Sequence, residues 1–338
     1  MRHYRLALMG FGNVGKAFVK LLLYKQEELL HRYHFTFSIT GIATRRHGMA
    51  VDPKGLDLSR ALLIEDLNSI SRTPIPRDGF EFIRRCGANV LLENTPVNYQ
   101  TGQPAIDHIT AGLEAGMHVI TANKGPVVHA YKQLRELAES KDRKFFFEST
   151  VMDGAPIFSL FREALPGSNL ISFRGILNST TNMILTRMED GESFDDAVAY
   201  CQKIGIAETD PSGDVDGWDA AVKVAALATV LMGVPLKPTE VMRDGIRSIS
   251  PEKILQARNA GKRWKLVCTA RKTEGGIEAK VSPELVEAGS PLFGVEGTSS
   301  IVQFETDVLG SLSIVESDPG PQTTAYGLFS DLLNALVK

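Results

Sequence analysis

The sequence predicts an α/β protein in two parts, with a doubly wound parallel sheet in the first part and an α+β domain in the second. Short apolar runs alternate with segments of helical spacing up to residue 147, as in a sheet whose strands are joined by helices. A glycine-rich turn separates the first apolar run from the first helical segment. Beyond residue 150, several strand-like runs are mixed with helices. A chain of 338 residues, 43% of them hydrophobic, is long enough for two domains and a substantial core.

Each element of the first part is predicted from its pattern, in chain order. The apolar run at residues 5–9 ends at a glycine and predicts a strand, and the helical spacing at 16–23 predicts the helix that follows. A second strand is expected at 35–43 and a third at 90–93. The remaining elements are a helix at 104–115, a strand at 117–121, a helix at 130–140 and an apolar strand at 144–147.

The second part contains strand-like runs at residues 170–177, 267–270, 277–281, 300–305 and 310–316. A helix built almost only from apolar residues begins after Gly217. The last helix, at 324–336, follows a Pro-Gly-Pro turn and is expected to complete the first domain. The predicted domains are therefore residues 1–147 completed by 318–338, and residues 148–317.

Composition narrows the class of partner. The net charge of −3 and the pI near 6.2 predict no basic field that would attract nucleic acid or an anionic membrane. The apolar run at the N-terminus is too short for a signal peptide or a membrane span. The three cysteines, at positions 86, 201 and 268, have neither disulfide nor metal-ligand spacing, which favours a cytoplasmic location. A small molecule and other protein chains are the expected partners.

The turn at residues 10–15, Gly-Phe-Gly-Asn-Val-Gly, is a candidate phosphate-binding loop. Gly10 permits a tight turn, Gly12 the approach of a pyrophosphate, and Gly15 close packing of helix on strand. Free N–H groups and the dipole at the helix N-terminus favour the anion. An ordinary structural turn is the alternative, but the place between strand and helix favours a Rossmann-like dinucleotide-binding domain. The expected cofactor-binding residues here are Gly10, Phe11, Gly12, Asn13, Val14 and Gly15.

The end of the second strand indicates which dinucleotide is bound. NAD-preferring sites usually place an acid there for the ribose 2′-hydroxyl, whereas this chain has Thr44, Arg45 and Arg46 and no acid before Asp52. Arginine binds a 2′-phosphate through charge-assisted hydrogen bonds, so the sequence favours NADP, with NAD as the alternative. The two arginines could instead belong to a solvated loop without a ligand.

The segment from Glu208 to Lys223 packs five acids and a lysine before and into the apolar helix. Asp219 and Lys223 are four residues apart in this helix and therefore share one face. Because their neighbours are almost all apolar, we expect the pair to be buried, and a buried lysine must be paired or functional. An ordinary exposed ion pair is the alternative.

Together, these motifs resemble homoserine dehydrogenase over nearly the whole chain. The order and spacing match in the glycine turn, Glu93-Asn-Thr-Pro96, Gly102-Gln-Pro-Ala-Ile-Asp-His-Ile109, Ala115-Gly-Met-His-Val-Ile-Thr-Ala-Asn-Lys-Gly-Pro126 and the acidic segment. The resemblance implies a Rossmann-like domain with a second α+β domain for substrate binding and dimerisation. It also implies a homodimer that interconverts L-aspartate 4-semialdehyde and L-homoserine with NAD(P), in the biosynthesis of threonine, methionine and isoleucine.

The resemblance further implies roles for single residues. Lys223 resembles the family's proton donor and acceptor, Asp219 its paired aspartate, and Lys124 the lysine near nicotinamide and substrate. Glu208 and Asp214 resemble the residues that hold the substrate's amino group. Asn178, Thr180 and Thr181 are expected in the substrate pocket, and Thr44, Arg45, Arg46, Asn94, Thr95, Pro96, Asn123 and Lys124 in the cofactor site.

The chemistry of the implied reaction suits these residue types. Reduction of an aldehyde requires hydride delivery to carbon and a proton or positive charge at the developing alkoxide, which a lysine can supply. The pKa of that lysine must fall toward the working pH. Desolvation and a second cation such as Lys124 act in this direction, whereas Asp219 opposes it.

Members of this family often hold a monovalent cation, Na⁺ or K⁺, through backbone carbonyls that follow an acid. The equivalent stretch here supplies Glu148, Val151, Asp153 and Ala155 as candidate ligands. A capping or loop role for the glutamate is the alternative.

Two departures from the family pattern bear on the substrate. Ser179 stands where the family usually has glycine, and the turn at 318–324 has fewer glycines than usual. They leave open a related oxidoreductase for another small amino or hydroxy acid. A catalytically silent NADP-binding sensor is a further alternative, although it would need only the glycine turn and the arginine pair. With no regulatory domain expected after residue 338 and no kinase domain before residue 1, feedback inhibition through such domains is not expected.

Overall fold

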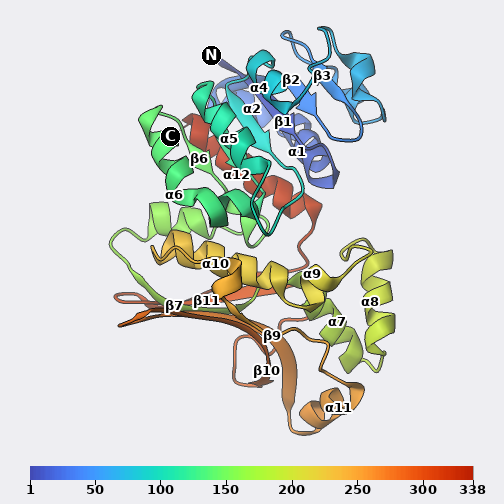
Figure 1. Cartoon of the computed structure of the whole chain (residues 1–338), viewed down its shortest axis with the longest axis vertical. Coiled ribbons are helices and arrows are strands. Elements are labelled where there is room, and N and C mark those ends of the chain that lie inside the picture. The colour runs from blue at the N-terminus through green and yellow to red at the C-terminus, as the bar shows by residue number, and fades with distance from the viewer. Residues whose placement is uncertain (338) are drawn as a thin grey trace. The chain divides into compact units, whose positions relative to one another are not determined.

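The computed structural model describes residues 1–337, which divide into two compact units (Figure 1). The first unit comprises residues 1–156 and the chain from Gly320 onward, and the second comprises 157–319. The first unit extends past the predicted boundary at 147. The reason is that the 3₁₀ turn η2 (Glu148–Thr150) is bound to the C-terminal helix, where Glu148 N donates to Asp331 Oδ2 at 2.7 Å.

The first unit contains a six-stranded sheet in the order β3-β2-β1-β4-β5-β6. All neighbouring strands are parallel except β3, which runs antiparallel to β2 at the edge. The predicted parallel, doubly wound sheet is therefore confirmed, and β3 is an addition. The strands are β1 (Arg2–Met9), β2 (Phe35–Ala43), β3 (Met49–Val51), β4 (Val90–Glu93), β5 (His118–Thr121) and β6 (Phe145–Phe146).

Helices pack around this sheet. They are α1 (Asn13–Tyr24), α2 (Gln26–Tyr33), α3 (Leu58–Ala61), α4 (Gly79–Arg85), α5 (Ala105–Glu114), α6 (Lys124–Ser140) and α12 (Pro321–Val337), with the 3₁₀ helix η1 (Leu67–Ile70). Helix α6 begins before the predicted start at 130, and non-helical φ and ψ angles at Ala130 mark a kink between its two parts. The buried residues Phe18 and Leu22 of α1 lie in one core cluster with Leu328 and Leu332 of α12.

The second unit contains a mainly antiparallel sheet in the order β12-β11-β7-β9-β10-β8. Its long hairpin, β9 and β10, pairs residue by residue from Lys262 with Glu287 to Thr273 with Gly276. The strands predicted there, at 267–270 and 277–281, cover less than half of each strand. The strands are β7 (Leu170–Ile176), β8 (Met242–Arg243), β9 (Lys262–Thr273), β10 (Gly276–Glu287), β11 (Ser300–Thr306) and β12 (Gly310–Glu316).

Helix α10 (Trp218–Leu231) packs against β9 and β10, and Figure 1 shows it lying over one face of the second sheet. Its residues from Ala220 to Val222 and from Val224 to Ala228 are buried, which confirms the predicted burial of this apolar helix on almost every side. The other helices of this unit are η3 (Leu160–Ala164), α7 (Ser179–Glu189), α8 (Phe194–Lys203), α9 (Ser212–Val215), η4 (Pro238–Glu240) and α11 (Pro251–Asn259). No helix within residues 1–337 combines the length and hydropathy needed to cross a membrane.

Candidate active site

In the turn between β1 and α1, close packing requires glycine at two positions, Gly10 and Gly15, whereas Gly12 faces open space. Gly10 has φ +94°, and a Cβ atom there would lie 2.3 Å from the main-chain oxygen of Asn94. A Cβ at Gly15 would lie 2.8 Å from the main-chain oxygen of Gly10. A Cβ at Gly12 would meet no heavy atom of the described chain within 4 Å, apart from its own neighbours. This open space fits the approach of a pyrophosphate.

The first turn of α1 is suited to an anion. Gly12 is the N-cap and provides no side-chain cap, and the first turn contains no acid. Phe11 is buried in the core and Val14 packs against it, so these two side chains fix the turn, whereas Asn13 is exposed. The N–H groups of the first turn are therefore left for a ligand.

The end of β4 supplies a polar side chain without a protein partner. Both Oδ1 and Nδ2 of Asn94 are buried, and neither forms a hydrogen bond with another described residue. Asn94 directly follows β4, and its backbone lies against Gly10. A buried amide of this kind fits a ligand that carries both a donor and an acceptor. The site lies at the carboxyl ends of β1 and β4, where the strand order reverses and dinucleotides bind in such sheets.

Asn123 joins the ends of β4 and β5 at the same edge. Its Nδ2 donates to the main-chain oxygens of Thr95 at 3.0 Å and Pro96 at 3.4 Å. Its Oδ1 accepts from Gly125 N at 3.0 Å and so caps α6. Lys124 is the first residue of α6 and is half-buried. The structure thus places these predicted cofactor-site residues at the same edge of the sheet as the glycine turn.

Thr44, Arg45 and Arg46 belong to a tight turn at the end of β2. Thr44 N and Oγ1 donate to the main-chain oxygen of Gly48 at 3.0 and 3.1 Å, and His47 N donates to Thr44 Oγ1 at 2.8 Å. The turn leaves both arginines exposed at the carboxyl end of the strand beside β1. Thr44 therefore shapes the turn, and the two exposed arginines remain the predicted ligands of a ribose 2′-phosphate.

The candidate cation segment from Glu148 to Ala155 is largely buried. Glu148 and Val151 are each 2% exposed. Asp153 has φ +38°, and its carboxylate accepts a hydrogen bond from Thr324 Oγ1. Within residues 1–337, no group of three or more His, Cys, Asp or Glu side chains could hold a metal ion. A cation here would have to rely on main-chain oxygens, and the four candidate ligands remain a prediction.

In the second unit, the amide of Asn178 joins the acidic segment to the start of α7. Its Nδ2 donates to Asp214 Oδ1 at 2.6 Å and to Asp219 Oδ2 at 3.0 Å. Its Oδ1 accepts from Thr181 N at 2.8 Å and Thr181 Oγ1 at 2.9 Å, which caps the helix. One side chain therefore orients two carboxylates at the same point.

Lys223 completes this cluster from the next turn of α10. Its Nζ lies 3.2 Å from Asp219 Oδ2 and donates to the main-chain oxygen of Leu177 at 2.5 Å. The side chains of Lys223 and Asp219 are only 14% and 10% exposed. The predicted buried pair is confirmed, and the alternative of an exposed ion pair is wrong.

The electrostatics of the cluster favour the binding of a cation. Burial raises the pKa of the Asp214 carboxyl, and the neighbouring Asp219 raises it further. The hydrogen bond from Asn178 and the charge of Lys223 act in the opposite direction. A cationic ligand placed at Asp214 would offset both the burial of the carboxylate and its repulsion by Asp219. An α-ammonium group is a cation of suitable size.

Other predicted substrate residues lie around or outside this cluster. Thr180 is 4% exposed and donates to the main-chain oxygen of Ile206 at 3.1 Å. Ser179 is the half-buried first residue of α7 and does not have a positive φ angle. Glu208 is exposed, and its side chain forms no hydrogen bond or ion pair with the part of the chain that the structure describes. The structure does not bring Glu208 into the cluster, so its role stays a prediction.

Two fully buried residues with ionisable side chains, Glu93 in the first unit and Lys265 in the second, were not predicted as functional from the sequence. Glu93, the last residue of β4, is 0% exposed. Lys265 in β9 is also 0% exposed and donates to Val295 O at 2.6 Å and to Asn182 Oδ1 at 3.2 Å. Burial lowers the pKa of Lys265 to about 8. Its alternation with the buried Val267 was the only sequence signal, since its basic neighbours suggest an exposed strand end.

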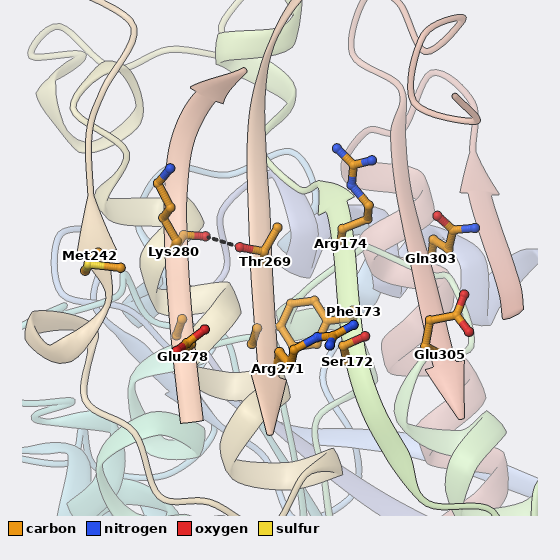
Figure 2. Close-up of a pocket in the computed structure, with 12 residues that line it drawn as sticks. Ser172, Phe173, Arg174, Met242, Thr269, Arg271, Glu278, Lys280, Gln303 and Glu305 are labelled. Atoms are coloured by element: carbon orange, nitrogen blue, oxygen red, sulfur yellow. Dashed lines mark hydrogen bonds between the residues drawn. The ribbon is translucent and has the colours of Figure 1, made fainter. Parts of the chain in front are cut away.

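One part of the second sheet is open and hollowed by a cavity of about 440 Å³. Figure 2 shows side chains from neighbouring strands along this cavity. The strand register places polar and charged residues opposite one another there: Ser172, Arg174, Thr269, Arg271, Glu278, Lys280, Gln303 and Glu305. The lining combines these polar and charged groups with apolar surface from Phe173 and Met242.

Comparison with known proteins identifies relatives of both units. Residues 10–148 match the family model described as homoserine dehydrogenase, NAD binding domain, and residues 156–333 match the model described as homoserine dehydrogenase. An NAD(+)-dependent homoserine dehydrogenase of Pseudomonas canavaninivorans is 35% identical over 99% of this chain and 96% of its own length. A homoserine dehydrogenase of Methanocaldococcus jannaschii is 37% identical over 97% of each chain.

Solved structures give the same result. The homoserine dehydrogenase of Thiobacillus denitrificans matches with a TM-score of 0.85 at 28% identity, over 99% of this chain and 74% of its own. A hyperthermophilic archaeal homoserine dehydrogenase in complex with NADPH matches with a TM-score of 0.83 at 29% identity, over 98% of this chain and 97% of its own. Both similarities extend over almost the whole of the present chain.

Proposed function

The chain belongs to the homoserine dehydrogenase family, and we propose how its residues divide the work of that reaction. It is an oxidoreductase that interconverts L-aspartate 4-semialdehyde and L-homoserine with a nicotinamide cofactor. The observation that carries the proposal is the buried cluster in which Asn178 orients Asp214 and Asp219 beside Lys223. The nicotinamide, when bound, accepts or donates the hydride.

Lys223 is proposed to handle the proton of the reacting oxygen. In aldehyde reduction it donates a proton to the developing alkoxide, and in alcohol oxidation it takes the proton back. Asp219, 3.2 Å from Lys223 Nζ, and the main-chain oxygen of Leu177 hold the lysine in place. Asp214 is proposed to bind the substrate's ammonium group, with Glu208 as a second candidate. Lys124 retains the role near nicotinamide and substrate that its place in the family motif implies.

The test of the whole proposal is turnover by the purified protein. We expect NADPH to form from L-homoserine and NADP, and to be consumed with L-aspartate 4-semialdehyde. Both reactions are monitored by the absorbance of NADPH. A protein that binds NADPH but turns over neither substrate would disprove the proposed activity. Turnover of another small aldehyde or keto acid in preference would favour the related oxidoreductase instead.

A related oxidoreductase remains a second candidate because of Ser179. This residue is the first of α7 and directly follows Asn178, which belongs to the proposed substrate cluster. If its side chain only fills space, Ser179→Gly should leave the ratio of activities on different aldehydes unchanged. If it serves another substrate, Ser179→Gly should raise the relative activity on aspartate semialdehyde by roughly 10 to 200-fold. We favour the first outcome.

The proposed cofactor preference is NADP, carried by the exposed Arg45 and Arg46 after β2. The relatives differ in cofactor. The enzyme of Pseudomonas canavaninivorans is named NAD(+)-dependent, whereas the hyperthermophilic archaeal enzyme was solved with NADPH. We expect tighter binding of NADP than of NAD, and loss of that preference in Arg45→Ala with Arg46→Ala. One bidentate charged contact is worth about 1.5 to 3 kcal/mol. Tighter binding of NAD by the parent would contradict this assignment.

A homodimer that pairs through the open part of the second sheet is also proposed. The acidic and basic side chains that alternate there, such as Arg271 and Glu278, could complement those of a second copy. We expect sedimentation to show a dimer for the parent and a monomer for Arg271→Glu with Lys280→Glu. A dimer unaffected by these changes would place the interface elsewhere.

Two further proposals concern ions and location. A monovalent cation at residues 148–155 is supported by the burial of Glu148 and Val151, and requires that activity depend on K⁺ or Na⁺ when choline is the reference salt. A cytoplasmic location is supported by the three cysteines, which are all buried and free.

A further inference from the structure

The carboxyl group of Glu93 lies at the centre of a polar network beneath the cofactor edge of the first sheet. Glu93 ends β4, the strand between β1 and β5, and is 0% exposed. Burial of an acid is costly unless hydrogen bonds offset it. Thr95 N donates to Oε1 at 3.2 Å, and Thr95 Oγ1 donates to the same oxygen. Thr121 Oγ1 lies 3.1 Å from Oε2 and 2.9 Å from the main-chain oxygen of Glu93, so its one proton is shared between two acceptors of the same residue. His108 Nδ1 lies 3.8 Å from Oε1 on the α5 side.

This network connects two loops that are far apart in the sequence. Through Thr95, Glu93 fixes the residue that follows Asn94, and Asn94 carries the buried amide without a protein partner. Through Thr121, it fixes the end of β5, because Thr121 Oγ1 also accepts from Asn123 N at 2.9 Å.

The same connection reaches the start of α6. Asn123 caps this helix through Gly125 N, and its Nδ2 returns to Thr95 O at 3.0 Å, which closes a ring of hydrogen bonds. The ring contains Glu93, Thr95, Asn123 and Thr121. Lys124 is the residue directly after this cap, so the position of its backbone depends on the ring.

We propose that Glu93 is a positioning residue for the nicotinamide cofactor, which acts by fixing the Asn94 amide and the start of α6 through Thr95 and Thr121. The proposal rests on the proposed cofactor site at this edge. Glu93 need not touch the cofactor itself. Its removal should therefore weaken cofactor binding more than the binding of the amino-acid substrate, because the substrate cluster is built from the second unit and only Lys124 is proposed to lie near both.

The test uses three single variants of the full chain, one double variant that combines Glu93→Gln with Thr121→Val, and a matched control. Glu93→Gln keeps the size of the side chain but replaces one acceptor oxygen with a donor group. Thr121→Val removes the hydroxyl while keeping a β-branched side chain suited to a strand, and Thr121→Ser retains the hydroxyl. The control is Thr40→Val, because Thr40 is also 0% exposed in the same sheet and its hydroxyl donates to Leu6 O at 3.4 Å, away from the cofactor edge.

Binding of NADPH is measured by its fluorescence without turnover, together with thermal unfolding and the KM values for both substrates. We expect Glu93→Gln and Thr121→Val each to weaken NADPH binding by roughly tenfold, the loss of about one hydrogen bond to a charged group. The double variant should lose little more than either single variant, because both break one network. Thr121→Ser should restore binding, and the KM for homoserine should change less than the affinity for NADPH.

The proposal is overturned if Thr121→Val melts at a lower temperature, as Thr40→Val does, yet binds NADPH like the parent. If Glu93→Gln does not fold, the comparison of Thr121→Val with Thr121→Ser decides whether the proposal holds. A parent that binds NADPH but does not oxidise homoserine contradicts the proposed function without affecting this inference. A parent that binds neither NADPH nor NADH overturns both.

Discussion

At the scale of single residues, Lys223 is the side chain on which the proposed proton transfer depends. Lys223→Met keeps most of the length of the side chain and removes the ammonium group, which contacts Asp219 and the main-chain oxygen of Leu177. We expect kcat to fall roughly a hundredfold or more, as for loss of a general acid and base. NADPH binding, measured by fluorescence, should stay within a few-fold of the parent, because Lys223 lies in the second unit. Lys203→Met, at an exposed position on α8, is the control, and unchanged kcat in both variants would remove Lys223 from the mechanism.

Asp214 predicts a pH dependence of substrate binding. Its pKa is raised by burial and by Asp219, so it becomes neutral at a higher pH than the ordinary value of about 4. A neutral carboxyl group no longer pairs with an ammonium ion. The KM for homoserine should therefore rise as the pH falls through the raised pKa, whereas Asp214→Asn should have a high KM without that transition. A parent whose KM is constant down to the ordinary range of aspartate would assign the ammonium group to another residue, with Glu208 the next candidate.

The predictability of these residues from sequence depended on how local their contacts are. The Asp219–Lys223 pair follows from helical spacing and an apolar surround, and it was predicted. The bridge made by Asn178 joins segments more than thirty residues apart and required the fold. The same holds for Glu93, whose partner Thr121 lies on another strand. Glu208 shows the reverse case, since its proximity in sequence did not bring it to the cluster.

At the scale of elements, two glycines of the turn between β1 and α1 have different expected roles. Gly10 is needed for the stability of the fold, and Gly12 for cofactor binding. Gly10→Ala would force a side chain to φ +94° and into Asn94 O, so it should cost roughly 1 to 3 kcal/mol of stability or more. Gly12→Ala meets open space and has an extended backbone with φ −80°, so its stability should change by less than about 0.5 kcal/mol.

NADPH titration then distinguishes the two roles, since the methyl group of Gly12→Ala would stand in the proposed pyrophosphate site. We expect at least a roughly tenfold loss of affinity in this variant without a change in thermal unfolding. If Gly12→Ala binds NADPH like the parent, the pyrophosphate does not approach the backbone at residue 12.

Elements were predicted well where an apolar run was bounded by glycine or polar turns, as for β2, β4 and α5. The predicted boundaries were wrong where strand pairing or a helix cap determines where the element ends. The hairpin of β9 and β10 extends through charged residues because each end pairs across the strands, from Lys262 with Glu287 to Thr273 with Gly276. Helix α6 starts at Lys124 because Asn123 caps it, although glycine and proline follow directly. Neither cause is a matter of hydrophobic spacing.

At the scale of the whole molecule, Lys265 predicts how stability varies with pH. Its pKa in the folded chain is about 8, below the ordinary 10.5, so the folded state binds its proton less tightly than the unfolded state does. The resulting destabilisation is fully present below pH 8 and is relieved as the pH rises toward 10.5. Relative to Lys265→Met, the parent should gain on the order of 2 to 3 kcal/mol in free energy of unfolding between these limits.

Denaturant unfolding at several pH values measures this gain. Both tryptophans of the chain, Trp218 and Trp264, lie in the second unit with Lys265, so intrinsic fluorescence reports on the unit concerned. A constant difference between parent and Lys265→Met over this pH range would mean that the lysine is not held in an unfavourable environment.

The two-part α/β architecture and the family were predictable, because alternating strands and helices and several spaced motifs act together over the whole chain. The antiparallel β3 was not, since three residues at a sheet edge carry no distinct pattern. The extent of the first unit was also hidden, because the contact that adds residues 148–156 comes from Asp331, near the other end of the sequence.

The return of the chain to the first unit through α12 has a consequence for synthesis on the ribosome. The apolar face of α1, with Phe18 and Leu22, has no cover from Leu328 and Leu332 until α12 emerges. At roughly 5 to 20 residues per second, translation of the intervening unit lasts on the order of ten seconds or more. During that interval the nascent N-terminal half presents an uncovered helix to solvent, and a chaperone that recognises apolar helical surfaces would bind this protein there first.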